Sequence, residues 1–299
     1  MLDVRRLRVL RELAARGTIA ATADALGYTA PAVSQQLAAL EREAGVELLE
    51  RNGRRRQLTP AGEELVARTE GILRELEAAE AAIERTTTQV AGVLRCAAFA
   101  SAHRTLLPRA IADLALRHPD LRVTTKDLEP EESLPALKLG ELDLALAQEY
   151  AFAPNPKDPA LERTDLLEDQ VRLALPASHR LAEHPEVDVA QLETEPWIAG
   201  KVGSSCHLVV IHSARQAGYE PRIAHVTNDF QVAYALVAAE AAVALVPELA
   251  GPPPPGVVTR AVAGAPPYRR IYAAVRAGSS QRPAIAAMLD ALVRRPSKV

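Results

Sequence analysis

Cysteine is scarce in this sequence, which has only Cys96 and Cys206 in 299 residues. Two cysteines cannot build a disulfide framework, so a reducing compartment such as the cytoplasm is expected. No run of about 18 uncharged apolar residues is present, and no apolar signal core follows the segment Met1–Arg6. We therefore predict a cytoplasmic protein without a membrane span, a secretory leader or a membrane partner.

The sequence has no large excess of positive or negative charge. Its 35 Lys and Arg residues and 38 Asp and Glu residues give a formal net charge of -3. This balance excludes a strongly basic nucleic-acid coat but remains compatible with one local basic surface. The apolar share of 48% and the charged share of 24% are ordinary for a globular protein. The length predicts two or three domains with substantial cores.

Motifs of common enzyme sites are also missing, since the sequence has no H-E-x-x-H, no P-loop and no G-x-G-x-x-G after a strand. His207 and His212 are five residues apart, so they do not face one metal ion from a single helix turn. The adjacent pair Glu131 and Glu132 is more typical of a solvated surface than of catalysis. We expect no enzymatic activity, no metal site and no cofactor.

Cap residues and glycines divide the N-terminal segment into three short helices. One helix is expected before Gly17, a second between Thr18 and Gly27, and a third between Thr29 and Gly45. The two-residue connection between the second and third helices has the length expected of a helix-turn-helix. In the third helix, apolar residues form one stripe, and short polar side chains lie elsewhere, as a helix that reads DNA bases in the major groove requires.

An Asn52-Gly53 pair then predicts a β-hairpin rich in arginine. Such a hairpin is typical of a wing that grips the DNA backbone. An ordinary surface domain with solvated arginines is the alternative for each feature taken singly, but the order and spacing of the features together favour a DNA-binding unit.

Five segments resemble the winged helix-turn-helix signature of LysR-type transcriptional regulators: Ala21–Leu26, Thr29–Leu37, Leu40–Glu41, Leu48–Arg51 and Leu58–Gly62. Ala30 departs from the glutamine common at its position, and Leu49 replaces a frequent phenylalanine. The resemblance implies that the chain binds double-stranded promoter or operator DNA. The residues expected to contact DNA are Thr18, Thr29, Ala30, Pro31, Ala32, Ser34, Gln35, Arg51, Arg54, Arg55 and Arg56.

A long helix is expected from Pro60 to about Arg85, with Thr59 as its cap. Its narrow apolar seam favours pairing with a partner helix, although packing on the chain's own globular domain is an alternative. The family uses this helix to dimerise, which favours a homodimer, and the resemblance implies a homotetramer. The seam comprises Leu65, Ile72, Leu76, Ala79 and Ile83. Residues 86–89, Thr-Thr-Thr-Gln, are expected to form a hinge.

From Val90 onward the pattern alternates strands and helices, which predicts parallel strands with helical crossovers. The strand before Pro176 is expected to begin at Val171. The final strand and helix are expected to return to the first lobe. Three segments resemble the two-lobed, periplasmic-binding-protein-like effector domain of LysR-type regulators: Leu139–Leu146, Leu175–Ala182 and Val243–Pro247.

The predicted fold is therefore α/β with an N-terminal winged helix-turn-helix, a long linker helix and a two-lobed effector domain. The expected divisions are 1–59, 60–89 and 90–299, with lobe one at 90–165 and 268–299 and lobe two at 166–267. Glu240 stands where the family often has glycine, so a helix end there lacks the residue that most easily adopts the left-handed conformation.

A ligand of an open α/β sheet binds at the carboxyl ends of its strands. Polar residues that follow predicted strands or open predicted helices are candidates, although plain helix capping is the alternative for each. The candidates are Ser101, His103, Gln148, Ser204, Ser205, His207, Asn228 and Asp229. Because helix N-termini attract anions, we expect an anionic small-molecule effector.

The preferred interpretation is a sequence-specific transcriptional regulator whose promoter contacts respond to an effector bound between the two lobes. A solute-binding protein is disfavoured by the missing leader and the additional N-terminal residues. An enzyme with an α/β core is disfavoured by the missing catalytic motifs. The sequence does not reveal the effector, the operator or the direction of regulation.

Overall fold

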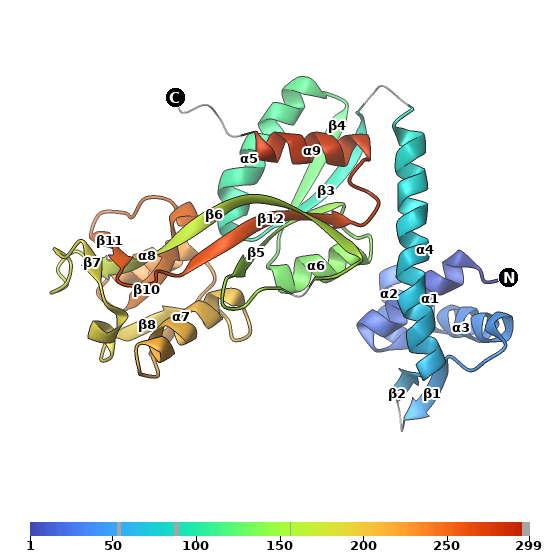
Figure 1. Cartoon of the computed structure of the whole chain (residues 1–299), viewed down its shortest axis with the longest axis horizontal. Coiled ribbons are helices and arrows are strands. Elements are labelled where there is room, and N and C mark those ends of the chain that lie inside the picture. The colour runs from blue at the N-terminus through green and yellow to red at the C-terminus, as the bar shows by residue number, and fades with distance from the viewer. Residues whose placement is uncertain (53–54, 87–89, 156, 295–299) are drawn as a thin grey trace. The chain divides into compact units, whose positions relative to one another are not determined.

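The computed structural model describes residues 1–52, 55–86, 90–155 and 157–294 (Figure 1). The chain divides into two compact units, each with its own core. The first comprises Met1–Thr86 together with Pro159–Leu161 and Arg276–Arg282, and the second comprises Thr87–Asp158, Glu162–Val275 and Pro283–Val299. Among the described residues, every helix is too short or too polar to span a bilayer.

The first unit contains four helices and a two-stranded hairpin in the described residues. The helices are α1 (Val4–Arg16), α2 (Ile19–Leu26), α3 (Ala30–Ala44) and α4 (Pro60–Glu84), and the strands are β1 (Leu49–Asn52) and β2 (Arg55–Leu58). The side chains of Thr18, Thr29 and Thr59 accept hydrogen bonds from backbone N–H groups in the first turns of α2, α3 and α4. Gly17 and Gly45 end α1 and α3 in the left-handed conformation. The three predicted short helices and their caps are confirmed.

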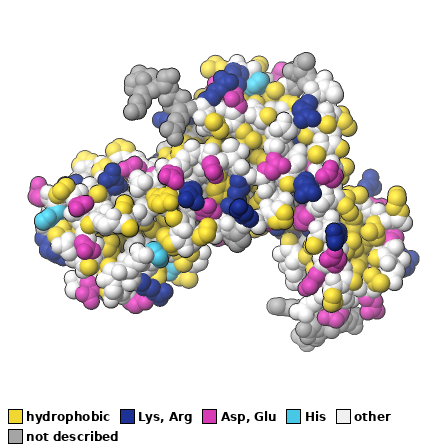
Figure 2. Space-filling model, viewed as in Figure 1, with side chains coloured by type: hydrophobic (Ala, Val, Ile, Leu, Met, Phe, Trp, Pro, Cys, Tyr) yellow, Lys and Arg dark blue, Asp and Glu magenta, His cyan; other side chains and the backbone are white. Residues whose placement is uncertain are grey.

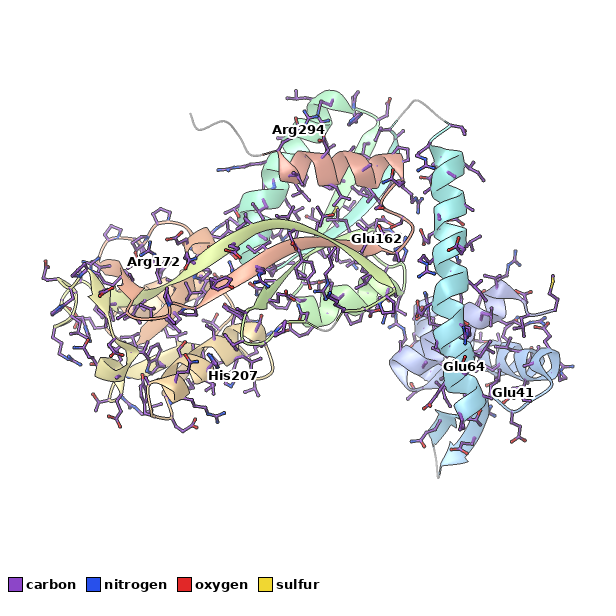
Figure 3. All side chains as sticks on the ribbon, viewed as in Figure 1. Glu41, Glu64, Glu162, Arg172, His207 and Arg294 are labelled. Atoms are coloured by element: carbon purple, nitrogen blue, oxygen red, sulfur yellow. The ribbon has the colours of Figure 1, made fainter. Side chains whose placement is uncertain are left out.

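The hairpin is held against the helices by a buried core and by Glu41. Leu48 and Leu49 pack into the cluster that contains Leu10 and Leu37. Glu41 Oε1 accepts hydrogen bonds from the backbone N–H groups of Leu48 and Leu49, at 3.0 and 3.1 Å. Figure 3 labels Glu41 on α3. The wing is therefore positioned by the same helix that presents the candidate DNA-reading side chains.

The second unit is built on one long mixed sheet with the strand order β4-β3-β5-β12-β6-β10-β8-β9, and β11 and β7 lie off this path. The strands are β3 (Gly92–Ala98), β4 (Leu121–Asp127), β5 (Leu144–Tyr150), β6 (Leu161–Pro176), β7 (Glu186–Val187), β8 (Pro196–Ala199), β9 (Arg222–Val226), β10 (Val243–Pro247), β11 (Val257–Val262) and β12 (Tyr268–Arg276). The two long strands β6 and β12 run through both lobes (Figure 1).

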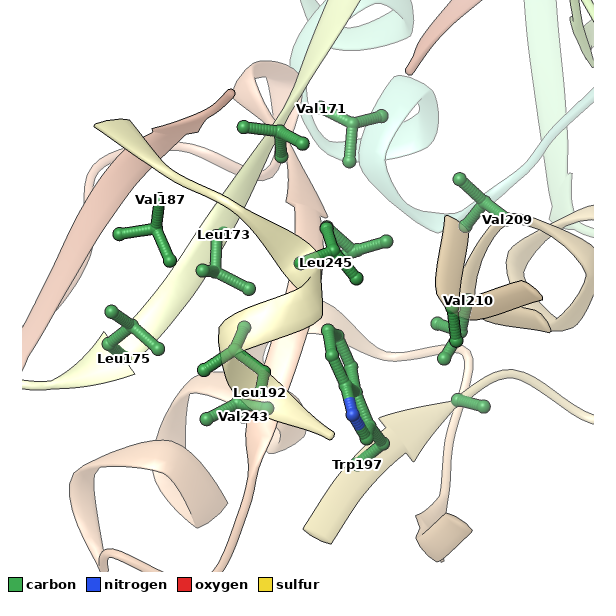
Figure 4. Close-up of a cluster of buried hydrophobic side chains, with 14 of the residues drawn as sticks. Val171, Leu173, Leu175, Val187, Leu192, Trp197, Val209, Val210, Val243 and Leu245 are labelled. Atoms are coloured by element: carbon green, nitrogen blue, oxygen red, sulfur yellow. The ribbon is translucent and has the colours of Figure 1, made fainter. Parts of the chain in front are cut away.

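Helices cover each lobe and close its core. They are α5 (Ala100–Arg117), α6 (Pro130–Lys138), α7 (Ser205–Gln216), α8 (Phe230–Ala238) and α9 (Pro283–Val293), with short 3-10 turns at Val189–Leu192 (η1) and Glu248–Ala250 (η2). In lobe one, Ile285 of α9 packs in the cluster of Leu107 and Ile271, so the last helix does return to the first lobe. In lobe two, Trp197 packs among Leu173 and Leu245 (Figure 4).

The parallel strands predicted from the alternation after Val90 are confirmed, because β3 pairs parallel with both β4 and β5. Other pairs in the sheet are antiparallel: β12 with β5, and β6 with β10 and β11. One prediction about the sheet is wrong. The strand expected from Val171 begins at Leu161. Residues 161–170 are mostly polar, with leucine only at Leu161, Leu166 and Leu167, so they carry no long apolar run. Pairing with other strands rather than local pattern makes them extended.

Glu240 is the only residue other than glycine with positive φ in the described part of the chain, with φ of 58°. The helix end after α8 therefore takes the left-handed conformation although glycine is missing there. The Ser178 side-chain oxygen donates a hydrogen bond to Glu240 Oε1 at 2.5 Å. A residue with a Cβ in this conformation is strained.

Candidate functional site

Helix α3 presents a narrow exposed edge on a fully buried back. Val33, Leu37 and Leu40 are at most 1% exposed, and they anchor the helix in the core of the first unit. Pro31 and Gln35 are exposed on the other side. A helix that is fixed by its back and polar on its front meets the requirement for reading base edges.

The remaining polar groups near α3 are partly used inside the protein. Ser34 Oγ donates to the backbone oxygen of Ala30 at 3.0 Å, while Gln36 Oε1 accepts a hydrogen bond from Arg6 Nε at 3.1 Å. Thr18 and Thr29 are exposed and act as helix caps. Ala30 is exposed and Ala32 is half-buried. Gln35 is thus the candidate DNA-contacting residue of α3 that has an exposed side-chain amide.

The wing has four residue pairs across two antiparallel strands. Arg51 lies opposite Arg56, and Asn52 lies opposite Arg55. Cross-strand arginines place positive charge on one short ribbon, which suits contact with phosphates. Arg54, predicted to contact DNA, lies outside the described residues, as do the side chains of Arg51 and Arg55.

Helix α4 has one exposed apolar seam and one covered face. Ile72 and Ile83 are 40% and 70% exposed, and Leu76 and Ala79 lie between them at spacings of four, three and four residues. Leu73 and Ala81 are buried on another face. The exposed seam has the heptad-like spacing of a helix that pairs with another helix.

The covered face of α4 contacts the segment Arg276–Arg282, which belongs to the same compact unit. Arg276 Nε lies 2.7 Å from Glu77 Oε1, and Arg282 Nη2 lies 2.6 Å from Glu84 Oε1. Gly278 approaches the helix backbone so closely that an added Cβ would lie 2.4 Å from the oxygen of Arg74. This face is therefore already occupied, whereas Ile72 and Ile83 of the seam remain exposed.

In the second unit, Arg269 of β12 gathers several candidate effector residues around a fully buried guanidinium. Its Nη2 donates to Ser101 Oγ at 2.8 Å, and its Nη1 donates to Gln148 Oε1. Nε and Nη2 donate to Asp169 Oδ2 at 2.9 and 2.8 Å. The guanidinium also lies 5.0 Å from the ring centre of Phe99 and 6.0 Å from that of Phe230. We call Ser101, Gln148, Asp169, Ser205 and Arg269 the interlobe polar cluster.

The interlobe polar cluster joins the two lobes through hydrogen bonds. Gln148 Nε2 donates to Ser205 Oγ of α7 at 3.3 Å. Asp169 Oδ1 accepts from the backbone N–H of Leu249 at 3.0 Å. Ser101 and Gln148 lie on α5 and β5 of lobe one, whereas Ser205 lies on α7 of lobe two, so a change in this cluster changes contacts of both lobes.

Ser204 and Asn228 converge beside the cluster. An added Cβ on Gly200 would lie 2.6 Å from Ser204 Oγ and 2.7 Å from Asn228 Oδ1, so both side chains close on this glycine. Ser204 Oγ caps α7 by accepting from His207 N at 3.2 Å. Asn228 Oδ1 accepts from Lys201 N at 2.9 Å. Both side chains therefore accept hydrogen bonds that stabilise local structure, and both lie near the interlobe polar cluster.

Three further candidate effector residues lie outside the interlobe polar cluster: His103, Asp229 and His207. His103 Nε2 lies 2.9 Å from Thr125 Oγ1 of β4. Asp229 caps α8 by accepting from Gln231 N at 2.8 Å. His207 lies on α7, where Figure 3 labels it, and its Nδ1 is buried without a hydrogen-bond partner among the described residues. For Asp229, the capping alternative accounts for the side chain.

Sequence reasoning missed Arg269, Asp169 and two glutamates at the start of α6. Arg269 precedes the apolar run Ile271–Val275, and Asp169 precedes Val171 by two residues. A charged residue shortly before an apolar run was the only available signal for Arg269 and Asp169, because neither of these two belongs to a recognisable motif. Burial and the neighbouring Glu131 raise the pKa of Glu129 to about 7.

Both cysteines are buried and unpaired, as Cys96 is in lobe one and Cys206 is on α7. Burial raises the pKa of the Cys206 thiol to about 12. The thiolate is the reactive form of cysteine, so neither burial nor charge favours reactivity of Cys206 at neutral pH. Among the described residues, His, Cys, Asp and Glu side chains form no group of three suited to a metal ion.

Two family models match this chain. Residues 4–63 match the bacterial regulatory helix-turn-helix protein, lysR family, and residues 87–297 match the LysR substrate binding domain. The transcriptional regulator MetR of Escherichia coli (strain K12) is 28% identical over 292 residues, which are 97% of this chain and 89% of MetR.

Solved structures are similar over nearly the whole chain. A full-length OxyR variant from Pseudomonas aeruginosa has a TM-score of 0.69 at 20% identity, with 98% of this chain and 95% of that chain covered. Full-length CbnR complexed with its target DNA has a TM-score of 0.55 at 26% identity, with 97% of this chain and 98% of that chain covered. The similarity to OxyR shows the fold. The CbnR structure shows a protein of this fold bound to its target DNA.

Proposed function

Because the chain belongs to the LysR family of DNA-binding transcriptional regulators and is not an enzyme, we propose how its own residues divide the work of that function. Helix α3 reads bases through Gln35, with Ser34, Pro31 and Ala32 beside it. The arginines of the wing contact phosphates or a minor groove. The buried stripe of Val33 and Leu37 behind an exposed Gln35 is the observation that carries this assignment.

The protein acts as a homodimer through the exposed seam of α4, and two dimers form a tetramer. Ile72 and Ile83 expose apolar surface that a second α4 would remove from water. A dimer carries two α3 helices, which suits an operator with two half-sites related by symmetry. Because it acts on promoter DNA, we place the protein in the cytoplasm.

The effector binds at the interlobe polar cluster and carries an anionic group. Ser101, Gln148 and Ser205 come from both lobes and meet around Arg269, so a ligand there changes contacts of both lobes at once. A ligand shifts a conformational equilibrium only by its difference in affinity for the two states. The N-terminus of α7 favours a negative charge, because its backbone N–H groups point outward.

A mobility-shift assay with the DNA upstream of the protein's own gene tests DNA binding, and the same assay with Ile72→Glu and Ile83→Glu tests the seam. We expect the wild type to shift this DNA as a dimer or larger assembly. The two charged variants are expected to bind this DNA at least tenfold more weakly than wild type. In a sedimentation measurement they are expected to be monomers. Unchanged sedimentation of both variants would place the dimer contact elsewhere.

A further inference from the structure

The N-terminus of α7 already holds a carboxylate, which comes from the protein itself. Glu131, in the first turn of α6, accepts a hydrogen bond at Oε1 from the backbone N–H of Ser205 at 3.3 Å. Ser205 is the first residue of α7, where the helix dipole favours negative charge. Glu131 is exposed, so its side chain can leave this position for solvent. A carboxylate therefore fits at this end of α7, and an internal one occupies the place.

Glu129 is the N-cap residue of α6, and its charge acts on Cys206 in the first turn of α7. Its Oε2 is buried and has no partner among the described residues. Burial and the charge of Glu131 raise its pKa to about 7, although Arg269 acts in the opposite direction. A buried acceptor without a donor is destabilising, and a cationic donor satisfies both the acceptor and the charge.

The guanidinium of Arg269 does not provide free positive charge for an anion. Asp169 accepts two of its N–H groups, and Ser101 and Gln148 accept others. Three carboxylates, those of Glu129, Glu131 and Asp169, therefore stand against one guanidinium. A ligand with only a carboxylate would bring a further negative charge to this group, whereas a ligand with an ammonium and a carboxylate has no net charge.

We propose that the effector is a small α-amino acid, whose carboxylate replaces that of Glu131 at the N-terminus of α7 and whose ammonium donates to Glu129. This inference rests on the proposed function, in which the effector binds at the interlobe polar cluster. It further makes Glu131 an internal competitor of the effector. Removing the Glu131 carboxylate opens the helix end, while removing the Glu129 carboxylate takes away the partner of the ammonium.

The test uses the full-length protein and measures its melting temperature with the twenty L-α-amino acids at millimolar concentration. Each amino acid is compared with its des-amino carboxylic acid and its decarboxylated amine. We expect at least one amino acid to raise the melting temperature and neither of its two analogues to do so. Calorimetry with that amino acid then gives the affinities of the variants.

The variants separate the two glutamates. Glu129→Gln is expected to weaken binding about tenfold or more, because a charged hydrogen bond is lost. Glu131→Gln is expected to strengthen binding several-fold, because the internal carboxylate no longer competes. Glu132→Gln, an exposed neighbour in the same helical turn, is the matched control and should bind as the wild type does. The Glu131 variant changes an exposed side chain, so it tests the inference even if the Glu129 variant fails to fold.

The outcomes distinguish this inference from the proposed function beneath it. If a des-amino acid binds as tightly as its amino acid, and Ser205→Ala weakens both, the effector site stands and the amino-acid assignment is overturned. If no amino acid binds, the assignment is likewise overturned. If an amino acid binds but neither Ser101→Ala nor Ser205→Ala changes its affinity, the site lies elsewhere and the proposed function fails as well.

Discussion

Arg269 and Asp169 form an ion pair at 2.8 Å in which the side chains are 0% and 3% exposed. Removing one partner of such a pair leaves an uncompensated buried charge, which typically destabilises a protein by about 3–5 kcal/mol. Asp169→Ala should lower the free energy of unfolding of the second unit by that amount, measured by urea titration.

The pair of Arg172 and Glu248 is the matched control, since its side chains are 42% and 49% exposed. Glu248→Ala should change stability by less than about 1 kcal/mol, because exposed pairs contribute little. Equal losses in the two variants would mean that burial of Arg269 does not set the strength of its pair.

Gln35→Ala tests the DNA-reading assignment. Loss of a direct base contact should cost about 1–3 kcal/mol at one base position and little at others. Selection from random DNA sites should therefore return a motif that is relaxed at that position. Gln36, whose amide oxygen accepts from Arg6, is the control, and Gln36→Ala should leave the motif unchanged. The assignment is wrong if the Gln35 variant selects the wild-type motif.

Arg55→Ala tests the wing. A lost phosphate contact should weaken binding to all DNA sequences alike, and it should reduce the slope of log affinity against log salt by about one. Arg68→Ala, which changes an exposed arginine paired with Glu64 on α4, should leave this slope unchanged. If Arg51, Arg54, Arg55 and Arg56 can each be replaced without effect on slope or affinity, the wing does not contact DNA.

Glu240→Gly should stabilise the protein by about 0.5–1 kcal/mol, because glycine adopts the left-handed conformation without the strain that a Cβ creates. The gain is reduced by loss of the hydrogen bond from Ser178. Ser178→Ala measures that bond separately. A loss of stability in the glycine variant larger than that of Ser178→Ala would contradict the strain argument.

Glu129 should make stability fall as pH rises. Its folded-state pKa is raised from 4.5 to about 7, so the folded protein binds more protons than the unfolded chain between these values. The stabilisation is present in full below pH 4.5 and is lost as pH rises through about 7. In urea titrations from about pH 5 to 8, Glu129→Gln should therefore have a flatter pH dependence than wild type. Parallel pH curves for the two proteins would show that Glu129 does not titrate in this range.

Local sequence determined the helices of the first unit and their caps. Thr18, Thr29 and Thr59 cap helices three residues away or less, and Gly17 and Gly45 end helices through their own backbone conformation. These interactions lie within one or two turns of chain, so the sequence records them directly. The exposed edge of α3 and the seam of α4 follow from the same short-range periodicity.

Only the tertiary structure decided the interlobe polar cluster. Arg269 lies 100 residues from Asp169, 121 from Gln148 and 168 from Ser101. The antiparallel pairing of β12 with β5 brings Arg269 into this position, and no local pattern specifies that pairing. Ser101, Gln148 and Ser205 were predicted because strand ends and helix starts have local signatures. The charged partner that joins them was not, because a buried guanidinium is placed by the packing of distant strands rather than by its neighbours in sequence.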